Sequence, residues 1–425
     1  MLSEFEKKVA GFIEANGLLG SADRVLLAVS GGADSIALLY AMSALDADNV
    51  LSAELFCAHI NHQLRGTEAN LDEDFVIAQA AKLKLPVTTK RLDVRGFAGR
   101  NKLSIETAAR KLRIESLLDM AKGNQCSRIA TGHQKNDNAE TILHRLARGT
   151  GFRGLGGIWP ARTFDVPLRL SSQDEAAGDN IKFVRPLLCV TRDEIIEYLK
   201  ARSLQWRVDH TNVDCTYRRS FIRYRLIPAL QQDCTGPIVE QLCELAHSAQ
   251  KYYILVCTRA EKAWSELADC ADDKAVLNLK SFLQESPAVK VELMRRSLAS
   301  LGSGEKDLTQ RHYESILQLA EQNVGGRKIE LPGRFVVRRE YGNLIFAGPE
   351  KSPYSNKQTS SSVKLEIPGQ TKFGQYLIQA AILDAGCSSL RSATEDGLML
   401  DARRKIKSRI ENRESGLWNG LIWIN

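Results

Sequence analysis

The feature that most constrains this chain is an apolar strand-like run, residues 25–29, that breaks into a short loop containing two glycines. The loop consists of Ser30, Gly31, Gly32, Ala33, Asp34 and Ser35. The apolar residues over 36–45 then predict a helix. Glycines allow a tight turn whose N–H groups face an anion, and the start of the helix adds the positive end of its dipole. The sequence therefore predicts a phosphate-binding loop rather than a plain tight turn.

The side chains of this loop suit a nucleotide and a metal ion. Ser30 and Ser35 can donate hydrogen bonds to phosphate oxygens, and the carboxylate of Asp34 can hold Mg²⁺. The loop contains neither the G-x-G-x-x-G pattern of dinucleotide-binding folds nor the G-K-[ST] of Walker loops. We therefore expect nucleotide binding by a loop of a different class.

Strands and helices are predicted to alternate through the first half of the chain. Strand-like runs cover 25–29, 51–58, 87–92 and 128–131, and helical spacing covers 36–45, 71–83, 104–122 and 139–147. This order implies an α/β fold with a Rossmann-like parallel sheet and helices on both faces. Ligands bind such sheets beyond the carboxyl ends of the strands, where the polar clusters of this half also fall. We place the active site in a domain over residues 1–215.

A mainly helical domain is expected over residues 216–349. Its predicted helices are 219–231, 238–268, 291–301 and 309–322, and its predicted strands are 327–331, 335–339 and 344–346. The polar, serine-rich segment 348–362 is predicted to be a linker. The remaining residues, 363–425, are expected to form a small α+β domain.

Composition places the chain among ordinary globular proteins, with 44% hydrophobic and 26% charged residues. No apolar run is long enough to cross a bilayer, so we expect a cytoplasmic protein with no membrane segment. The nine cysteines include no Cys-x-x-Cys pair, which argues against a disulfide scaffold, a zinc ribbon or a redox pair. The net charge of +7 is compatible with a polyanionic partner, and the oligomeric state is left open.

A second cluster lies where the predicted strand 128–131 passes into a helix. Asp137 and Glu140 are three residues apart, so on a helix both carboxylates share one face and suit a cationic amine. The alternative is that they only cap the start of the helix, where acidic residues are favoured. His133 is either part of the same site or a structural histidine at the end of a strand.

Histidine and arginine side chains fall beside the same predicted edge of the sheet. His59 and His62 are three residues apart, but no further histidine or cysteine with ligand spacing lies nearby, which argues against zinc. Arg110 and Arg113 share one face of the predicted helix 104–122. They belong either to a solvated surface with salt bridges or to a face that meets ATP or RNA.

Two basic segments are candidates for RNA contacts. Arg148 lies in a glycine-containing turn, and the segment 217–225 contains Arg218, Arg219, Arg223 and Arg225. Each guanidinium offers a planar fork of donors that matches a phosphate. The aromatic residues between these arginines are interpreted as core rather than as base-stacking groups.

Six segments, in their order along the chain, resemble the tRNA(Ile)-lysidine synthetases, a family of the PP-loop ATP pyrophosphatase superfamily. The segments are 30–35, 58–66, 131–141, 148–155, 184–188 and 209–212. The resemblance is close over 20–230 and weaker through 308–346. It implies that ATP adenylates the C2 oxygen of cytidine 34 in a tRNA(Ile) with a CAU anticodon, releasing pyrophosphate. The ε-amine of free L-lysine then displaces AMP to give lysidine.

The resemblance also implies roles for individual residues. ATP and Mg²⁺ are expected at Ser30, Gly31, Gly32, Ala33, Asp34, Ser35, His59 and Arg113, with Asp34 as the metal ligand. The expected catalytic residues are Asp34, His133, Asp137 and Glu140, and the last two are expected to bind the lysine. The basic segments place the tRNA contacts at Arg148, Arg218, Arg219, Arg223 and Arg225. Near 413–417 the chain departs from the family, so we expect 363–425 to be a shortened form of its tRNA-gripping C-terminal domain.

Two other functions compete with this interpretation. A tRNA thiolase of the same superfamily would deliver sulfur to an adenylated base, but members that carry a cluster use Cys-x-x-Cys, which this chain lacks. A catalytically inactive tRNA-binding protein is the second alternative. The presence of Ser30, Asp34, Asp137 and Glu140 argues against it.

Overall fold

The structure is a computed structural model, and the part of the chain that it describes forms two compact units, Met1–Glu350 and Lys351–Asn425. The described residues are 1–163, 181–207, 218–233, 236–271, 273–303, 308–322, 327–349, 369–373, 376–382, 405–412 and 416–423. Every predicted site residue lies in the larger unit.

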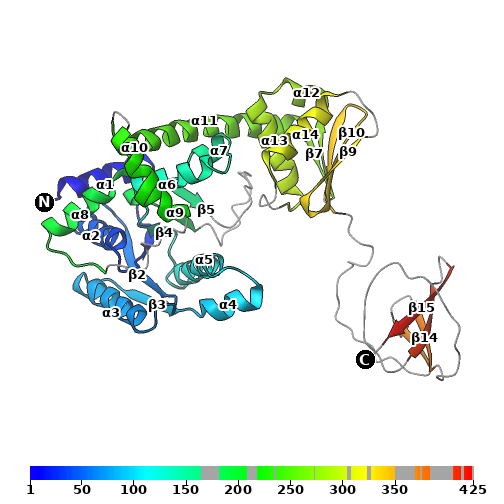
Figure 1. Cartoon of the computed structure of the whole chain (residues 1–425), viewed down its shortest axis with the longest axis horizontal. Helices are drawn as coiled ribbons and strands as arrows, with labels where there is room; N and C mark the ends of the chain where they lie inside the picture. The colour runs from blue at the N-terminus through cyan, green and yellow to red at the C-terminus, as the bar shows by residue number, and fades with distance from the viewer. Residues whose placement is uncertain are drawn as a thin grey trace. The chain divides into compact units, whose positions relative to one another are not determined.

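The first half of the larger unit is built on a six-stranded sheet in the order β3-β2-β1-β4-β6-β5 (Figure 1). Its strands are β1 (Arg24–Ala28), β2 (Glu54–Asn61), β3 (Val87–Arg91), β4 (Arg128–Thr131), β5 (Ala161–Thr163) and β6 (Lys182–Val184). Neighbouring strands run parallel except for β5, which pairs antiparallel with β6 at the edge. In the centre, Leu27 lies opposite Cys57 of β2 and Ala130 of β4. The predicted Rossmann-like parallel sheet is confirmed, with β5 and β6 as unpredicted additions.

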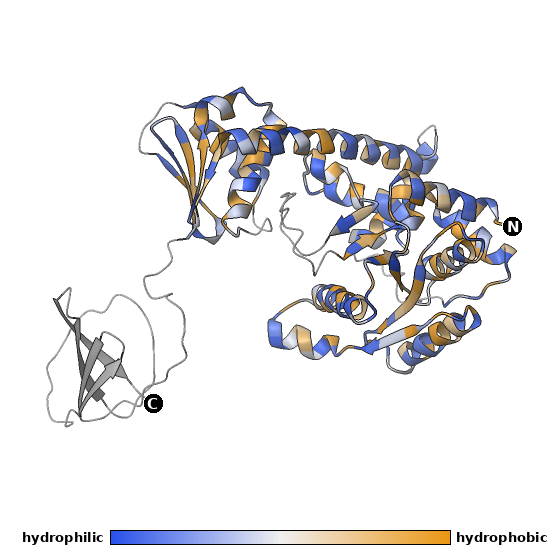
Figure 2. Ribbon diagram, turned by 180° about the vertical axis from the view of Figure 1, so that it is seen from behind, coloured by the Kyte–Doolittle hydropathy of each residue, from blue (hydrophilic) through white to orange (hydrophobic). Residues whose placement is uncertain are grey.

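Helices cover both faces of this sheet (Figure 2). They are α1 (Glu4–Ala15), α2 (Ala33–Ala47), α3 (Thr67–Lys82), α4 (Val94–Asn101), α5 (Ile105–Gly123), α6 (Lys135–Leu146), α7 (Phe152–Leu155) and α8 (Arg192–Ala201), with a short 3-10 helix η1 (Pro186–Cys189). Because successive strand residues point to opposite faces, Leu27 packs into the core of α1, α2, α3 and α8, whereas Leu26 packs with Leu117 and Met120 of α5. These two apolar layers fix the strand ends that carry the site.

The second half of the larger unit joins helices to a five-stranded antiparallel sheet, in the order β7-β8-β11-β10-β9. Its helices are α9 (Arg218–Phe221), the π-helix η3 (Ile222–Leu226), α10 (Ile227–Asp233), α11 (Ile238–Leu267), α12 (Leu279–Gln284), α13 (Pro287–Ser300) and α14 (Gln310–Glu321). Its strands are β7 (Ala268–Cys270), β8 (Lys274–Asn278), β9 (Lys328–Leu331), β10 (Phe335–Glu340) and β11 (Asn343–Ala347), and a 3-10 turn η5 (Pro332–Arg334) separates β9 from β10. The sheet is larger than predicted, because β7 and β8 join the three strands that the sequence indicates.

The 30-residue helix α11 connects the two halves of this unit (Figure 1). Its first part packs on α6 and α7, and its last part packs on α13. Ala246 and Ala260, one from each part, have no exposed surface. The helix therefore contributes to the apolar cores of both halves.

The smaller unit is an antiparallel sheet in sequence order: β12 (Gly369–Phe373), β13 (Tyr376–Ile382), β14 (Lys405–Asn412) and β15 (Gly416–Trp423). Its described residues all lie in these strands. The helical part of the α+β prediction, and almost all of the predicted linker 348–362, lie outside the described residues. In the described part of the whole chain, no helix combines the length and hydropathy that crossing a bilayer requires.

Candidate active site

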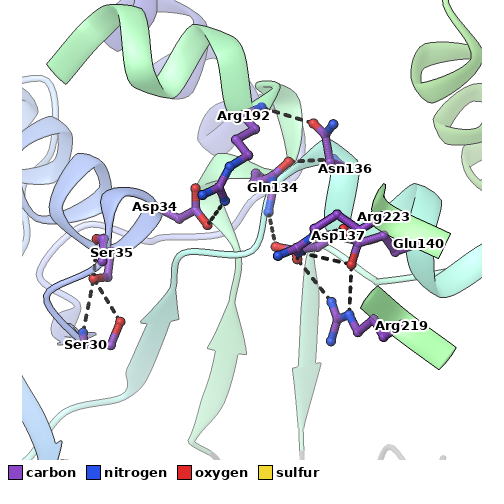
Figure 3. A network of polar contacts seen from close by, with 11 residues as sticks. Ser30, Asp34, Ser35, Gln134, Asn136, Asp137, Glu140, Arg192, Arg219 and Arg223 are labelled. Atoms are coloured by element: carbon purple, nitrogen blue, oxygen red, sulfur yellow. Dashed lines mark hydrogen bonds and ion pairs between the residues drawn. The ribbon is translucent and has the colours of Figure 1, made fainter. Parts of the chain in front are cut away.

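The predicted phosphate-binding loop lies between β1 and the first turn of α2, and its own hydroxyls hold its shape (Figure 3). The Oγ of Ser35 accepts a hydrogen bond from the Ser30 N–H at 3.1 Å and donates to the Gly32 carbonyl at 2.9 Å. The two serine Oγ atoms are 3.2 Å apart. Gly31 has a φ of +91°, which a residue with a Cβ rarely adopts. The loop thus has the tight turn before a helix N-terminus that anion binding requires.

The loop that follows β4 lies against the phosphate-binding loop. A Cβ atom added at Gly132 would lie 2.9 Å from the Asp34 carbonyl oxygen, so only a glycine lets the two backbones come this close. This contact brings the cluster at 133–140 beside the nucleotide loop, as the rule for carboxyl strand ends predicts. We did not predict a role for Gly132, although its place between a strand and His133 offers the signal.

Asp34 has a carboxylate that lacks a full set of partners. Its Oδ2 lies 3.4 Å from Nη1 of Arg192, while its buried Oδ1 has no hydrogen-bond partner in the described part of the chain. Burial raises the pKa of Asp34 to about 6, the charge of Arg192 opposes the shift, and that of Asp137 adds to it. A cation beside Oδ1 would relieve this cost. Arg192 is a site residue that the sequence analysis missed.

The donor set fits a magnesium ion bound partly by substrate. Among the described residues no group of three or more His, Cys, Asp or Glu side chains could hold a metal. Mg²⁺ is commonly bound through one or two carboxylates together with substrate phosphates. A single unpartnered aspartate oxygen within a phosphate-binding loop matches that mode.

The predicted histidines are part of the protein framework and stay neutral at pH 7. Nδ1 of His59 lies 2.9 Å from the Val29 carbonyl oxygen, and burial lowers the pKa of His59. Nδ1 of His133 lies 2.8 Å from Oγ1 of Thr131. Burial, helped by the positive charges of Arg185 and Arg113, lowers the pKa of His133 to about 3. Without a bound anion His133 is therefore uncharged and can act as a neutral donor or acceptor.

Arginines gather around His133 without matching carboxylates. Neither Arg110 nor Arg113 makes an ion pair or hydrogen bond within the described residues. Burial lowers the pKa of Arg113, and the charges of Arg110 and Arg219 lower it further. Arg185, which the sequence analysis did not select, donates to the Trp159 carbonyl at 2.6 Å, and burial lowers its pKa to about 10. Such a cluster of like charges favours an anionic ligand.

The two carboxylates predicted for the amine do share one face of α6, and two arginines occupy them (Figure 3). Nε of Arg219 donates to Glu140 Oε2 at 2.9 Å, and its Nη2 donates to Asp137 Oδ1 at 3.1 Å. Nη2 of Arg223 donates to Glu140 Oε2 at 3.1 Å and to Asp137 Oδ1 at 3.3 Å, and its Nε donates to Glu140 Oε1. The two positive charges therefore balance the two negative ones.

Asp137 combines both roles that its spacing suggests. Its Oδ2 accepts a hydrogen bond from the Gln134 N–H at 3.2 Å, which caps the start of α6. Its Oδ1 faces Arg219 and Arg223 in the cleft. The capping interpretation and the ligand-facing interpretation are thus compatible for Asp137, and Glu140 supplies the second carboxylate.

The predicted RNA-contacting arginines fall into two groups. Arg219 and Arg223 pair with carboxylates in this structure, so a phosphate contact by either would have to break ion pairs. Arg148 and Arg225 are exposed and make no ion pair within the described residues. Arg218 begins α9, and its side chain lies outside the described part. Contact with RNA remains a prediction for all five.

One cleft of about 3890 Å³ in the larger unit joins these features. Its lining includes Ser30, Asp34, His59, Arg113, His133, Asp137, Arg148, Arg219 and Arg223, together with Tyr252 of α11 and Arg311 of α14. We call it the central cleft. It brings the phosphate-binding loop, Asp137 of the carboxylate pair, the two arginines that cover Glu140 and side chains of the second half to one solvent space.

The fold and the phosphate-binding loop place this chain among PP-loop proteins: residues 1–230 match the PP-loop domain, and 277–345 match the TilS substrate binding domain. It is 31% identical to a tRNA(Ile)-lysidine synthase of Clostridioides difficile, over 81% of this chain and 70% of that protein. The corresponding enzyme of Clostridium perfringens is 31% identical over 80% and 68%, and that of Dehalococcoides mccartyi 31% over 90% and 78%. The chain belongs to the tRNA(Ile)-lysidine synthase family.

Proposed function

We propose that this chain forms lysidine on tRNA(Ile), joining the ε-amine of free L-lysine to C2 of cytidine 34 in a CAU anticodon. The observation that carries the proposal is that a phosphate-binding loop and Asp137 line the same cleft, with Glu140 buried beside Asp137 under the same two arginines. The anionic leaving group of ATP needs cations and N–H donors, and a cationic amine needs carboxylates. Few reactions other than an ATP-dependent amine ligation need both.

In the first step the C2 oxygen of cytidine 34 attacks the α-phosphorus of ATP, and pyrophosphate leaves. The N–H groups of the loop after Ser30, at the start of α2, would receive the phosphates. Arg113 and Arg110, which lack carboxylate partners in the described part of the chain, would meet the negative charge that develops. His59 is held by the Val29 carbonyl behind the loop, so a positioning role fits it better than proton transfer.

In the second step the lysine amine attacks C2, and the C–O bond to AMP breaks. Asp137 and Glu140 would bind the ammonium groups of lysine, and they could do so only when at least one arginine leaves them. The attacking amine must lose a proton. His133 is neutral and lies in the same cleft, so it is our candidate for the proton acceptor.

Asp34 is the residue that would hold Mg²⁺, through the Oδ1 atom that lacks a partner among the described residues. When bound, the ion supplies positive charge that screens the phosphates and the leaving pyrophosphate. Arg192, on the other oxygen of the same carboxylate, would hold that side chain in place.

The tRNA would enter the central cleft from the side of α7, α11 and α14. The exposed rings of Phe152 and Tyr252 lie with their centroids 5.0 Å apart in its wall, which Arg148 also lines. Unstacked bases of RNA loops commonly stack on such rings, and arginines bind the phosphates between them. We assign 1–215 to catalysis, 216–349 to tRNA binding and 363–425 to further tRNA contacts, and we place the enzyme in the cytoplasm with its tRNA.

The deciding experiment incubates the protein with ATP, Mg²⁺, L-lysine and a tRNA(Ile) transcript that carries a CAU anticodon, followed by mass spectrometry of the nucleosides. Lysidine should appear only when all components are present. The same transcript with a GAU anticodon is the matched control and should stay unmodified. AMP release without a lysine adduct on the tRNA would overturn the proposal. No lysine adduct together with full tRNA binding would point to the inactive tRNA-binding protein.

A further inference from the structure

Every oxygen of the carboxylate pair already has a hydrogen-bond partner from the same chain. All four oxygens of Asp137 and Glu140 accept at least one hydrogen bond, three of them from Arg219 or Arg223 and the fourth from the Gln134 N–H. The Glu140 side chain is only 1% exposed, and that of Asp137 13%. A cationic substrate therefore cannot reach this pair without replacing something.

Arg219 occupies the place that an ammonium group would take. Its two N–H groups bridge Asp137 Oδ1 and Glu140 Oε2, at 3.1 and 2.9 Å, so a single cation of the substrate could make the same two contacts. Its side chain is 54% exposed and lines the central cleft. It can swing into solvent without opening the core.

Arg223 is held more firmly than Arg219. Its side chain is 30% exposed and contacts both oxygens of Glu140. Burial disfavours its charge, but the hydrogen bonds and charges of Glu140 and Asp137 outweigh burial and raise the pKa of Arg223. Arg223 can therefore keep the pair partly neutralised after Arg219 has left.

We propose that the Arg219 guanidinium is a built-in occupant of the amine site, and that an RNA phosphate in the central cleft draws it away and so opens the site for lysine. This inference rests on the proposed function. A phosphate is the matching partner because a planar guanidinium binds it through two N–H groups, as it binds the carboxylates. The cleft already presents Arg110, Arg113 and Arg148, which have no carboxylate partners among the described residues and would hold the RNA close to Arg219. Lysine capture would then follow tRNA binding.

The test measures lysine affinity by calorimetry on the full chain without ATP, so that no turnover occurs. The tRNA(Ile) transcript with the CAU anticodon should tighten lysine binding to the unmodified chain by about tenfold or more, the value of one charge-assisted pair. The Arg219→Ala variant should bind lysine without RNA as tightly as the unmodified chain does with RNA. Adding RNA to this variant should change its lysine affinity little.

The matched control is Arg259→Ala. Arg259 on α11 makes a two-pronged ion pair with Glu285, the residue that follows α12. Its side chain is 48% exposed, and it does not line the cleft. This variant should keep the RNA dependence of the unmodified chain. Circular dichroism checks that both variants fold. If Arg219→Ala does not fold, the lysine affinity of the unmodified chain with and without RNA still tests whether RNA opens the site.

Two results would overturn the inference while leaving the proposed function standing. One is an equal lysine affinity of the unmodified chain with and without RNA. The other is an RNA dependence that persists unchanged in folded Arg219→Ala. If the nucleoside assay forms no lysidine and lysine fails to bind under any condition, the proposed function itself fails.

Discussion

The two sides of the central cleft differ in whether their charged groups have partners. On the nucleotide side, Asp34 Oδ1 is buried without a partner, and Arg113 faces no carboxylate among the described residues. On the amine side, every carboxylate oxygen of Asp137 and Glu140 is hydrogen-bonded. An unpaired buried polar group costs free energy, so the nucleotide side is completed only by a ligand. The amine side is complete without one, and its ligand has to compete with arginines.

This difference predicts different responses to the two ligands. ATP with Mg²⁺ adds contacts that the ligand-free protein lacks, so it should stabilise the fold strongly. Lysine exchanges one set of ion pairs for another and should stabilise it little.

Replacing Asp34 with alanine should lower the rate of AMP formation by about 10²–10³, because it removes a preorganised group that holds charge beside the phosphates. The measurement is AMP release with the CAU transcript and lysine. Asp119→Ala is the control. Asp119 is an exposed residue of α5 that pairs with Lys90 of β3, so its replacement should leave the rate unchanged. Near-normal AMP release by a folded Asp34→Ala variant would show that Asp34 does not hold the metal ion.

Replacing Glu140 with glutamine should raise the KM for lysine far more than the KM for ATP. The loss of one partner in a charge-assisted pair costs roughly 1.5–3 kcal/mol, which corresponds to about a tenfold to hundredfold weaker lysine affinity. Steady-state kinetics with each substrate varied in turn gives both constants. Equal increases in the two KM values would mean that Glu140 supports the whole site rather than the amine.

Replacing Asp34 with asparagine should stabilise the ligand-free protein at neutral pH. The pKa of Asp34 is about 6 in the folded chain and 3.8 without the fold, so as pH rises from about 4 to 6 the unfolded chain loses this proton first. The stability contribution of Asp34 therefore falls across that window. Above pH 6 the free energy of unfolding of Asp34→Asn should exceed that of the unmodified chain by on the order of 2 kcal/mol, which a higher melting temperature would show. The two melting temperatures should converge near pH 4. A difference that does not change with pH would mean that burial of the charge is not the cause.

The sequence predicts the local parts of this architecture well. The strand at 128–131 has the predicted bounds, and Asp137 and Glu140 share a helical face as their spacing requires. Short edge strands escape prediction because three residues carry no periodicity, and α4 contains Gly96 and Gly99, which weaken its helical signal. The sequence analysis does not predict helix α8, although Thr191 and Glu194 form a capping box that marks its start.

Long-range pairing is the part of the site that sequence spacing cannot supply. Arg192 meets Asp34 across 158 positions, and Arg219 meets Glu140 across 79. Taken alone, each segment suits a ligand: the carboxylates suit an amine, and the arginines suit phosphates. Only the tertiary fold shows that they also suit each other, and this is the origin of the competition on the amine side.

The smallest effect concerns an arginine that, unlike Arg219, makes no ion pair among the described residues. Arg148 is exposed and lines the cleft, so a phosphate contact there breaks no existing interaction. Replacing it with alanine should weaken tRNA binding and lower the slope of log Kd against log salt by about 0.7–0.9, the value of one phosphate contact. Discrimination of the CAU anticodon should survive, because phosphate contacts carry no sequence information. Arg100→Ala, an exposed arginine of α4 that does not line the cleft, should leave the slope unchanged. An unchanged slope in Arg148→Ala as well would place the RNA path on another face, and would leave the amine side without a nearby phosphate to release Arg219.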